Sequence, residues 1–223
     1  WITTLRPPRA RSEQAELQTR ELYTLDDMLK LCQYEPKSFM ERRSQAAAAF
    51  LFLSGMRIGA FVTLPIGCVD LPGMRVMQLP EKGVATKNRK AAETSLLNIA
   101  ELLDVVRKWD AFVRAGLSDR HPWYAALDLD GKLAKEIPCQ KTLVDRRHSF
   151  NDDLRLLCQA AGVQYLSAHK FRHGHAVYCI KRAKDMAQMK AISENLMHAT
   201  IGITDGIYGR LARDDKHRLI TGL

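Results

Sequence analysis

The sequence predicts a mainly α-helical fold with a small antiparallel β-sheet, and three observations lead to this class. Residues 46–53 are apolar on every side of a helical period, which is typical of a helix buried on all faces. Residues 100–116 carry apolar side chains at helical spacing. Residues 75–79 and 93–99 each have the pattern of a short strand, and a basic, turn-prone segment lies between them.

The composition is that of one large globular domain, or of one domain with an extension. The 223 residues are 46% hydrophobic, which suffices for a sizeable core. The formal net charge of +9 and the pI near 9.4 point to a polyanionic partner, most simply nucleic acid, and equally to a protein that is merely basic. The sequence contains no apolar run of about 18 residues and no signal-peptide pattern, so we expect neither membrane insertion nor export.

The five cysteines are widely spaced, odd in number and without a Cys-x-x-Cys pair. This pattern argues against a disulfide framework and against a cysteine-rich zinc site. Reduced thiols are typical of cytosolic proteins, so we expect a cytoplasmic protein that associates with the nucleoid where DNA is its partner. The chain begins at Trp1 rather than at methionine, and we expect it to be part of a longer protein.

The N-terminal quarter is expected to contain an arm and two helices. Residues 1–20 are polar and basic and have the composition of an interdomain linker. Thr24, which two aspartates follow closely, predicts the start of a short helix. Ser38 and Glu41 have the spacing of a capping box, which predicts a second helix that continues through the apolar run. Gly55 is expected to end that helix.

Arg57 lies just beyond the end of this buried helix. A buried guanidinium is costly unless it meets an anion, which can be a carboxylate of the protein or a phosphate of a ligand. From this residue alone, an ion pair with a buried carboxylate is the better explanation.

The connection between the two predicted strands is basic. Residues 83–90 predict a hairpin that carries Lys87, Arg89 and Lys90, and Lys82 precedes it. Taken alone, these cations have the pattern of solvated hairpin residues.

The rest of the chain is expected to be largely helical. The helix over residues 100–116 should end with Gly116 as its cap and place Trp109 and Phe112 in the core, rather than expose them for base stacking. A loop with a hairpin turn at Asp130-Gly131 should follow. We expect further helices over residues 140–161, 169–182, 184–196 and, weakly, 200–208. The first of these carries basic residues that either follow a DNA backbone or form a solvated face, namely Lys141, Arg146, Arg147 and His148.

Residues 166–210 concentrate the side chains suited to phosphate chemistry. Arg172 can clamp a phosphate through its planar fork of donors. Tyr208 can attack phosphorus as a covalent nucleophile, and His169 and His198 can move protons or donate hydrogen bonds. If His169 opens a helix, Arg172 lies one turn further along on the same face. This set of groups is suited to phosphoryl transfer onto a side chain.

These residues resemble the motifs of the tyrosine recombinases, the family of phage integrases and their relatives. The segment from His169 to Arg172 is similar to the His-x-x-Arg box of the family. His198 and Tyr208, ten residues apart, are similar to its second histidine and its tyrosine.

The first half of the chain adds two further motifs, so that the resemblance extends over residues 22–212. Residues 54–64 resemble the first arginine box of the family, with Arg57 at the position of the arginine. Ala85-Thr-Lys87 is similar to its Thr-Lys pattern, which makes Lys87 a stronger candidate than Lys90 or Lys82.

The resemblance implies a tyrosine recombinase catalytic-domain fold over residues 21–223, with a C-terminal tail from about residue 211. In the family such tails often dock on a neighbouring subunit, and packing of this tail in cis or in trans stays open. The core-binding domain that precedes the catalytic domain in the family would lie outside this chain. The implied function is site-specific recombination, or integration, of double-stranded DNA at an attachment site. The implied assembly is a homotetramer on DNA, whereas the isolated catalytic domain should be monomeric.

The resemblance also implies a role for each site residue. Tyr208 would attack a DNA phosphodiester and leave a 3′-phosphotyrosine, with His169 as the base that removes its proton. Two arginines would hold the phosphate oxygens, a lysine would protonate the leaving 5′ oxygen and a histidine would hydrogen-bond the phosphate; these are Arg57, Arg172, Lys87 and His198. Contacts to DNA are expected from Arg89, Lys90, Lys141, Arg146, Arg147, Lys170 and His173.

Neither a metal nor another cofactor is expected. In the implied reaction the two arginines do what a metal ion does in many phosphoryl-transfer sites. His169 and His173 have the helical spacing of two zinc ligands, but the sequence lacks a His-Glu-x-x-His pattern, so a zinc hydrolase fits poorly.

Three positions depart from the family pattern. Ala60 and Lys170 stand where an acid is common, and Met197 stands where glycine is common. Two alternatives therefore stay open. One is a type IB topoisomerase-like or resolvase-like enzyme with the same cleavage step. The other is a DNA-binding module that has lost catalysis, an outcome with which Ala60 is consistent.

Overall fold

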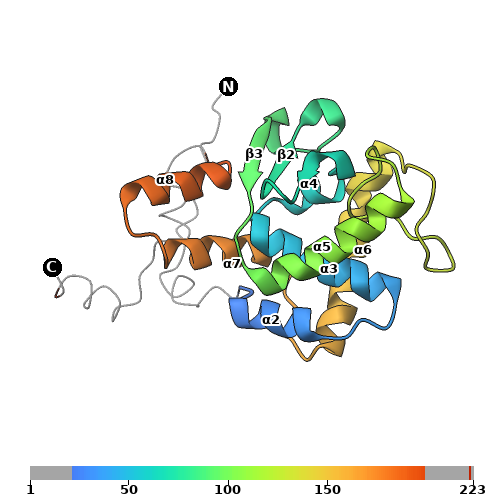
Figure 1. The fold of residues 1–223 in the computed structure, drawn as a ribbon, viewed down its shortest axis with the longest axis horizontal. Helices are drawn as coiled ribbons and strands as arrows, with labels where there is room; N and C mark the ends of the chain where they lie inside the picture. Colours follow the sequence, from blue (N-terminus) through green and yellow to red (C-terminus); the bar gives the residue numbers. More distant parts are fainter. Residues whose placement is uncertain (1–21, 199–220, 222–223) are drawn as a thin grey trace, which may run out of the picture.

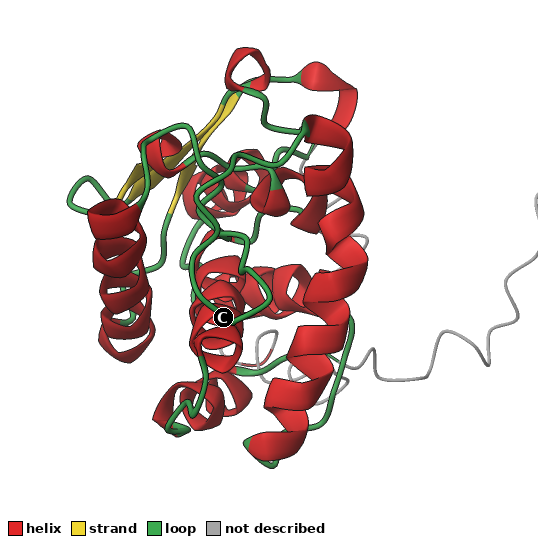
Figure 2. Ribbon diagram, turned by 90° about the vertical axis from the view of Figure 1, so that its right-hand side faces the viewer, coloured by secondary structure: helices red, strands yellow, loops and turns green. Residues whose placement is uncertain are grey.

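The computed structural model describes residues 22–198 and Thr221, apart from the side chains of Gln140 and Lys141. Helices form most of this part of the chain, and a small antiparallel sheet lies at one side of the helical body (Figures 1 and 2). The predicted fold class is therefore confirmed. In chain order the elements, with η for a 3-10 helix, are α2 (Leu25–Gln33), α3 (Phe39–Ser54), α4 (Ile58–Val62), η1 (Ile66–Cys68), β1 (Val69–Asp70), β2 (Arg75–Gln78), η2 (Pro80–Lys82), η3 (Lys87–Arg89), β3 (Ala92–Ser95), α5 (Ala100–Gly116), α6 (Gln140–Ala160), α7 (His169–Ile180) and α8 (Met186–Asn195).

The first two helices begin where the capping residues predict. Thr24 and Asp27 form a full capping box, because each side chain accepts a hydrogen bond from the backbone N–H of the other residue. Ser38 caps α3 by accepting from the N–H of Glu41 at 3.2 Å. The predicted box at α3 is only half formed, since the Glu41 carboxylate accepts from the N–H of Lys37 instead.

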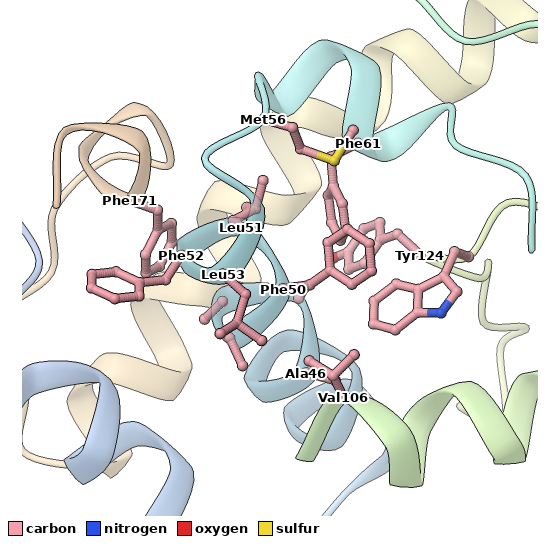
Figure 3. Close-up of a cluster of buried hydrophobic side chains, with 14 of the residues drawn as sticks. Ala46, Phe50, Leu51, Phe52, Leu53, Met56, Phe61, Val106, Tyr124 and Phe171 are labelled. Carbon is pink, nitrogen blue, oxygen red and sulfur yellow. The ribbon is translucent and has the colours of Figure 1, made fainter. Parts of the chain in front are cut away.

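Helix α3 is the centre of the core, as its apolar composition predicts. Every residue from Arg43 to Ser54 is buried, and α2, α5, α6 and α7 all pack against this helix. Figure 3 shows Phe50 and Phe61 on one side of α3 and Phe52 with Phe171 on the other. The Phe50 ring lies 5.4 Å from the ring of Phe61 and 4.6 Å from that of Trp123, between centroids. The helix thus joins two halves of the core, one under α4 and α6 and one under α7.

The three strands pair in the order β1-β2-β3, all antiparallel. The second predicted strand is wrong at its C-terminal end, because β3 stops at Ser95 rather than at Ile99. After that residue the chain turns toward α3, and the Leu97 N–H donates to the Leu53 carbonyl at 3.0 Å. The predicted hairpin is confirmed, since β2 and β3 pair antiparallel, and the two short helices η2 and η3 fill the connection between them.

The remaining predicted helices up to residue 196 are observed with small shifts at their ends, whereas the weak helix over residues 200–208 lies outside the described residues. Gly116 is the last residue of α5 rather than its cap, and Leu117 takes the cap position in an extended conformation. Trp109 is fully buried, in agreement with a core role. The turn at Asp130-Gly131 is present, with Gly131 in the left-handed region. Among the described helices, none is long and apolar enough to cross a bilayer.

Candidate functional site

Gly55 marks the point where the two arginine motifs meet. It caps α3 in the left-handed conformation, with φ of 61°. A Cβ atom at this position would lie 2.6 Å from Cδ2 of His175 and 2.9 Å from Cδ2 of Leu196. Glycine therefore permits the left-handed backbone turn at this position, and it leaves room for α7 and the residue after α8 to approach closely.

Arg172 lies in this junction with 3% of its surface exposed. Its Nη1 donates to the carbonyl of Gly55 at 2.7 Å, and its Nη2 donates to the carbonyl of Leu196. The same Nη2 lies 2.9 Å from Nε2 of His198. These contacts hold the planar guanidinium in one orientation, as bidentate recognition of an anion requires.

The two candidate histidines lie within the electrostatic reach of both candidate arginines. Burial, followed by the charges of Arg172 and Arg57, lowers the pKa of His198 from 6.5 to about 4. The same three causes, with a smaller effect of Lys170, lower the pKa of His169 below its ordinary value. The structure thus brings together four predicted site residues, and it favours neutral imidazoles near pH 7.

A Schellman motif at the end of α8 sets the direction of His198. The Met197 N–H donates to the Glu194 carbonyl at 2.7 Å, and the His198 N–H donates to the Ser193 carbonyl at 3.0 Å. Met197 adopts φ of 52°, the left-handed region that favours glycine. The departure at Met197 therefore changes the residue but retains the glycine-like turn, at a cost of about 1 kcal/mol.

Three supporting residues were not predicted as part of the site. His175 is buried, its Nδ1 donates to the Phe52 carbonyl at 2.7 Å, and burial lowers its pKa to about 4. The Tyr23 hydroxyl bonds both the N–H and the carbonyl of Leu166, at 2.7 and 2.6 Å. The Asn151 side chain accepts from the N–H of Ala168, directly before α7. The position of His175, one helical turn after Arg172, could have indicated its place near the site from the sequence. The contacts of Tyr23 and Asn151 join residues that are distant along the chain, so no local pattern indicates them.

Lys87 lies on an exposed connection that is tied to the first arginine motif. The Ala85 N–H donates at 2.8 Å to Oγ1 of Thr63, a buried residue at the end of α4. Asn88 and Arg89 both have positive φ, at 59° and 52°, so the chain reverses sharply just after the lysine. Within the described residues, the Lys87 ammonium makes no ion pair or side-chain hydrogen bond, and its side chain is exposed.

The predicted DNA contacts divide into exposed and buried side chains. Arg89, Lys90 and Arg147 are exposed, and Lys170 and His173 are half-buried, the His173 ring lying 4.6 Å from that of His169. The side chain of Lys141 and all of Tyr208 lie outside what the structure describes. The Arg146 side chain points into the protein instead.

Arg146 and Arg43 both make cation–π contacts with the ring of Tyr124. Their guanidinium carbons lie 4.7 and 4.5 Å from the ring centroid, respectively. Both donate to the carbonyl of Ala125 at 2.9 Å, and Asp153 accepts from Arg43 at 2.6 Å. Burial lowers the pKa of Arg146 to about 10. We therefore infer a structural role for Arg146 in place of the predicted DNA contact.

Ala60 leaves the first arginine motif without the acid that is common at this position in the family. The residue is 1% exposed and packs in the core, one turn after Arg57 opens α4. An acid here would need a buried cationic partner, whereas the alanine needs none. The departure at Ala60 is thus compatible with the packing of α4.

Comparison with known proteins gives a consistent result. The sequence model of the phage integrase family matches residues 22–214. Tyrosine recombinase XerC of Herpetosiphon aurantiacus is 29% identical over 177 residues, which are 77% of this chain and 49% of the relative. The chain thus spans about half the length of that relative.

Solved structures resemble the fold. The crystal structure of XerA recombinase matches with a TM-score of 0.61 and 17% identity, over 97% of this chain and 66% of that one. XerH site-specific recombinase, bound to its palindromic difH substrate, matches with a TM-score of 0.58 and 16% identity, over 90% of this chain and 52% of that one.

Proposed function

The chain belongs to the phage integrase family, and from this membership we propose that it is the catalytic part of a site-specific tyrosine recombinase. Its substrate would be double-stranded DNA at an attachment site, which it would cleave and rejoin through a 3′-phosphotyrosyl intermediate. The proposed working assembly is a homotetramer on DNA, with the isolated chain monomeric. One relative is named as a tyrosine recombinase, and structural neighbours are named as a site-specific recombinase and an integrase, which supports this proposal.

One observation carries the proposal. Arg172 is almost fully buried, yet its guanidinium is oriented by two carbonyls beside His198, and Arg57 acts on the same imidazole. Two guanidinium groups beside two neutral imidazoles are a suitable site for a phosphodiester, because they offer charge, donors and a base in one place.

In the proposed reaction Tyr208 attacks the scissile phosphorus. The Tyr208–phosphorus bond forms and the bond from phosphorus to the 5′ oxygen breaks, so one ester replaces another. Free tyrosine has a pKa near ~10 and needs a base, for which His169 is neutral and exposed. Lys87 gives a proton to the leaving 5′ oxygen.

The two arginines and His198 act on the phosphate oxygens in this scheme. Arg57 and Arg172 balance the charge that builds up on the non-bridging oxygens, and His198 donates a hydrogen bond to one of them. Removing one such donor typically slows a reaction by about 10²–10³-fold. A neutral imidazole carries one N–H. Because Nε2 of His198 accepts from the Arg172 guanidinium, the contact selects the tautomer whose Nδ1–H can donate to the phosphate.

Covalent trapping tests the proposal. The full-length protein is incubated without added metal with DNA that carries its attachment site and a nick beside the cleavage position, so that religation fails. We expect a protein–DNA adduct on denaturing gels that Tyr208→Phe abolishes. Tyr178→Phe, a matched change on α7, should leave the adduct intact.

Other outcomes would redirect the proposal. Tight binding to a verified site without any adduct would overturn it in favour of a DNA-binding module without catalysis. An adduct without junction formation between two labelled duplexes would favour a type IB topoisomerase-like or resolvase-like enzyme.

A further inference from the structure

The side chain of Asn195 binds the edge of the sheet. It is the last residue of α8, and the C-terminal end of this helix approaches β3 (Figure 1). Its Oδ1 accepts from the N–H of Ser95 at 2.6 Å, and its Nδ2 donates to the carbonyl of the same residue at 3.2 Å. In the described part of the chain β3 is an edge strand, so the amide pairs with backbone groups that a further strand would otherwise bind.

The residues that follow Asn195 bind Arg172. The carbonyl of Leu196 accepts from the guanidinium, and Nε2 of His198 lies 2.9 Å from it. The Schellman motif between them is a rigid turn, so a shift of Asn195 moves both groups. Leu196 itself is fully buried against Gly55.

The β3 side of the Asn195–Ser95 contact is also tied to the core, through α3. Two residues after Ser95, the N–H of Leu97 donates to the carbonyl of Leu53 at 3.0 Å. Leu53 lies two residues before Gly55, whose carbonyl accepts from Arg172. The contacts therefore form a closed ring from α3 through the sheet, Asn195 and Arg172 back to α3, and Asn195 is the member that joins sheet and α8.

We propose that Asn195 is a positioning residue, which holds the Leu196 carbonyl and His198 against Arg172 by pairing with the edge of β3. The proposal rests on the proposed function of these groups. An amide suits the task because it offers one donor and one acceptor to the two backbone groups of Ser95. Aspartate would keep the acceptor but set a carboxylate against the Ser95 carbonyl.

The first test reads the position of His198 without any catalysis. Its imidazole is titrated by NMR in the wild type, in Asn195→Ala and in Asn195→Asp. We expect the pKa of His198 to rise toward 6.5 in both variants, because the ring leaves its half-buried place beside Arg172. The control is Gln188→Ala, which removes a side chain that accepts from the Lys184 N–H at the other end of α8. An unchanged His198 titration in a folded Asn195 variant would overturn the proposal.

The second test uses cleavage of nicked DNA by the full-length protein. Asn195→Ala should slow adduct formation by roughly 10- to 100-fold, as misplaced groups do, and should add little to the effect of His198→Ala. With sulfur in place of the leaving 5′ oxygen, proton donation by Lys87 becomes unnecessary, yet the Asn195→Ala defect should persist. A defect that the sulfur substrate rescues would assign Asn195 to the lysine loop and refute the link to His198.

A protein that makes no adduct in the wild type contradicts the proposed function, not this inference. The NMR titration still decides the inference in that case, because it needs neither DNA nor turnover.

Discussion

At the scale of single residues, Gly55 combines two constraints that can be separated by experiment. Gly55→Ala must place a Cβ against His175 and Leu196 and also adopt a positive φ. Gly162 has a similar φ of 66°, but a Cβ there would meet nothing within 4 Å. We expect Gly162→Ala to cost about 1 kcal/mol and Gly55→Ala to cost about 1–3 kcal/mol more, measured by urea unfolding. Equal costs would mean that the close approach is easily relaxed.

Met197 permits a second test of backbone strain. Met197→Gly and Met197→Ala both remove the half-buried side chain, but only glycine adopts φ of 52° without strain. We therefore expect the glycine variant to be more stable than the alanine variant by about 1 kcal/mol in thermal or urea unfolding. At Met186, an exposed residue in the first turn of α8, the same pair should show the opposite order.

His175 should make stability depend on pH. Its pKa is about 4 in the folded protein against 6.5 for an ordinary histidine, so the unfolded chain binds more protons between these values. Stability should therefore rise with pH through this window and fall on acidification, by up to about 3 kcal/mol. His175→Gln should flatten the dependence between pH 5 and 6.5 in urea unfolding. If the slope of the free energy of unfolding against pH were the same in His175→Gln as in the wild type, groups other than His175 would cause the pH dependence.

At the scale of elements, the lysine connection depends on Thr63. Thr63→Val removes the acceptor of the Ala85 N–H, whereas Thr94→Val removes the acceptor of Gln78 within the sheet. Both threonines are buried, so each change should cost about 1–3 kcal/mol. Only Thr63→Val should speed hydrogen exchange in residues 84–90, measured by mass spectrometry. Equal exchange in the two variants would show that Thr63 does not hold the connection.

The elements themselves were predictable to the extent that local chemistry defines them. Thr24 and Ser38 cap their helices as predicted, and the apolar run of α3 is buried on every side. The failures lie where a distant partner intervenes. The strand β3 ends early because Leu97 bonds to α3, and Glu41 leaves the capping box for another N–H.

At the scale of the whole molecule, the proposed DNA contact should be confined to one part of the surface. Arg89→Gln with Lys90→Gln should lower the slope of log Kd against log salt by about 2, because each lost phosphate contact removes about 0.9. The matched pair Arg107→Gln with Lys108→Gln, exposed on α5, removes the same charge and should leave the slope unchanged. If titrations with attachment-site DNA gave the same slope for both double variants, the assignment of Arg89 and Lys90 to the DNA-binding surface would be contradicted.

By itself, the sequence determined the fold class, the order of the helices, the buried central helix and the motif residues of the candidate site. Periodicity, caps and motif spacing involve residues that are close along the chain, so they can be recognised without a structure.

Only the tertiary structure decided how those residues are held. Arg172 binds a carbonyl 117 positions away, and Asn195 binds an edge strand 100 positions away. Arg146, predicted to face DNA, lies against Tyr124 instead. Such contacts depend on how helices and sheet pack, and packing joins segments whose proximity no local pattern records.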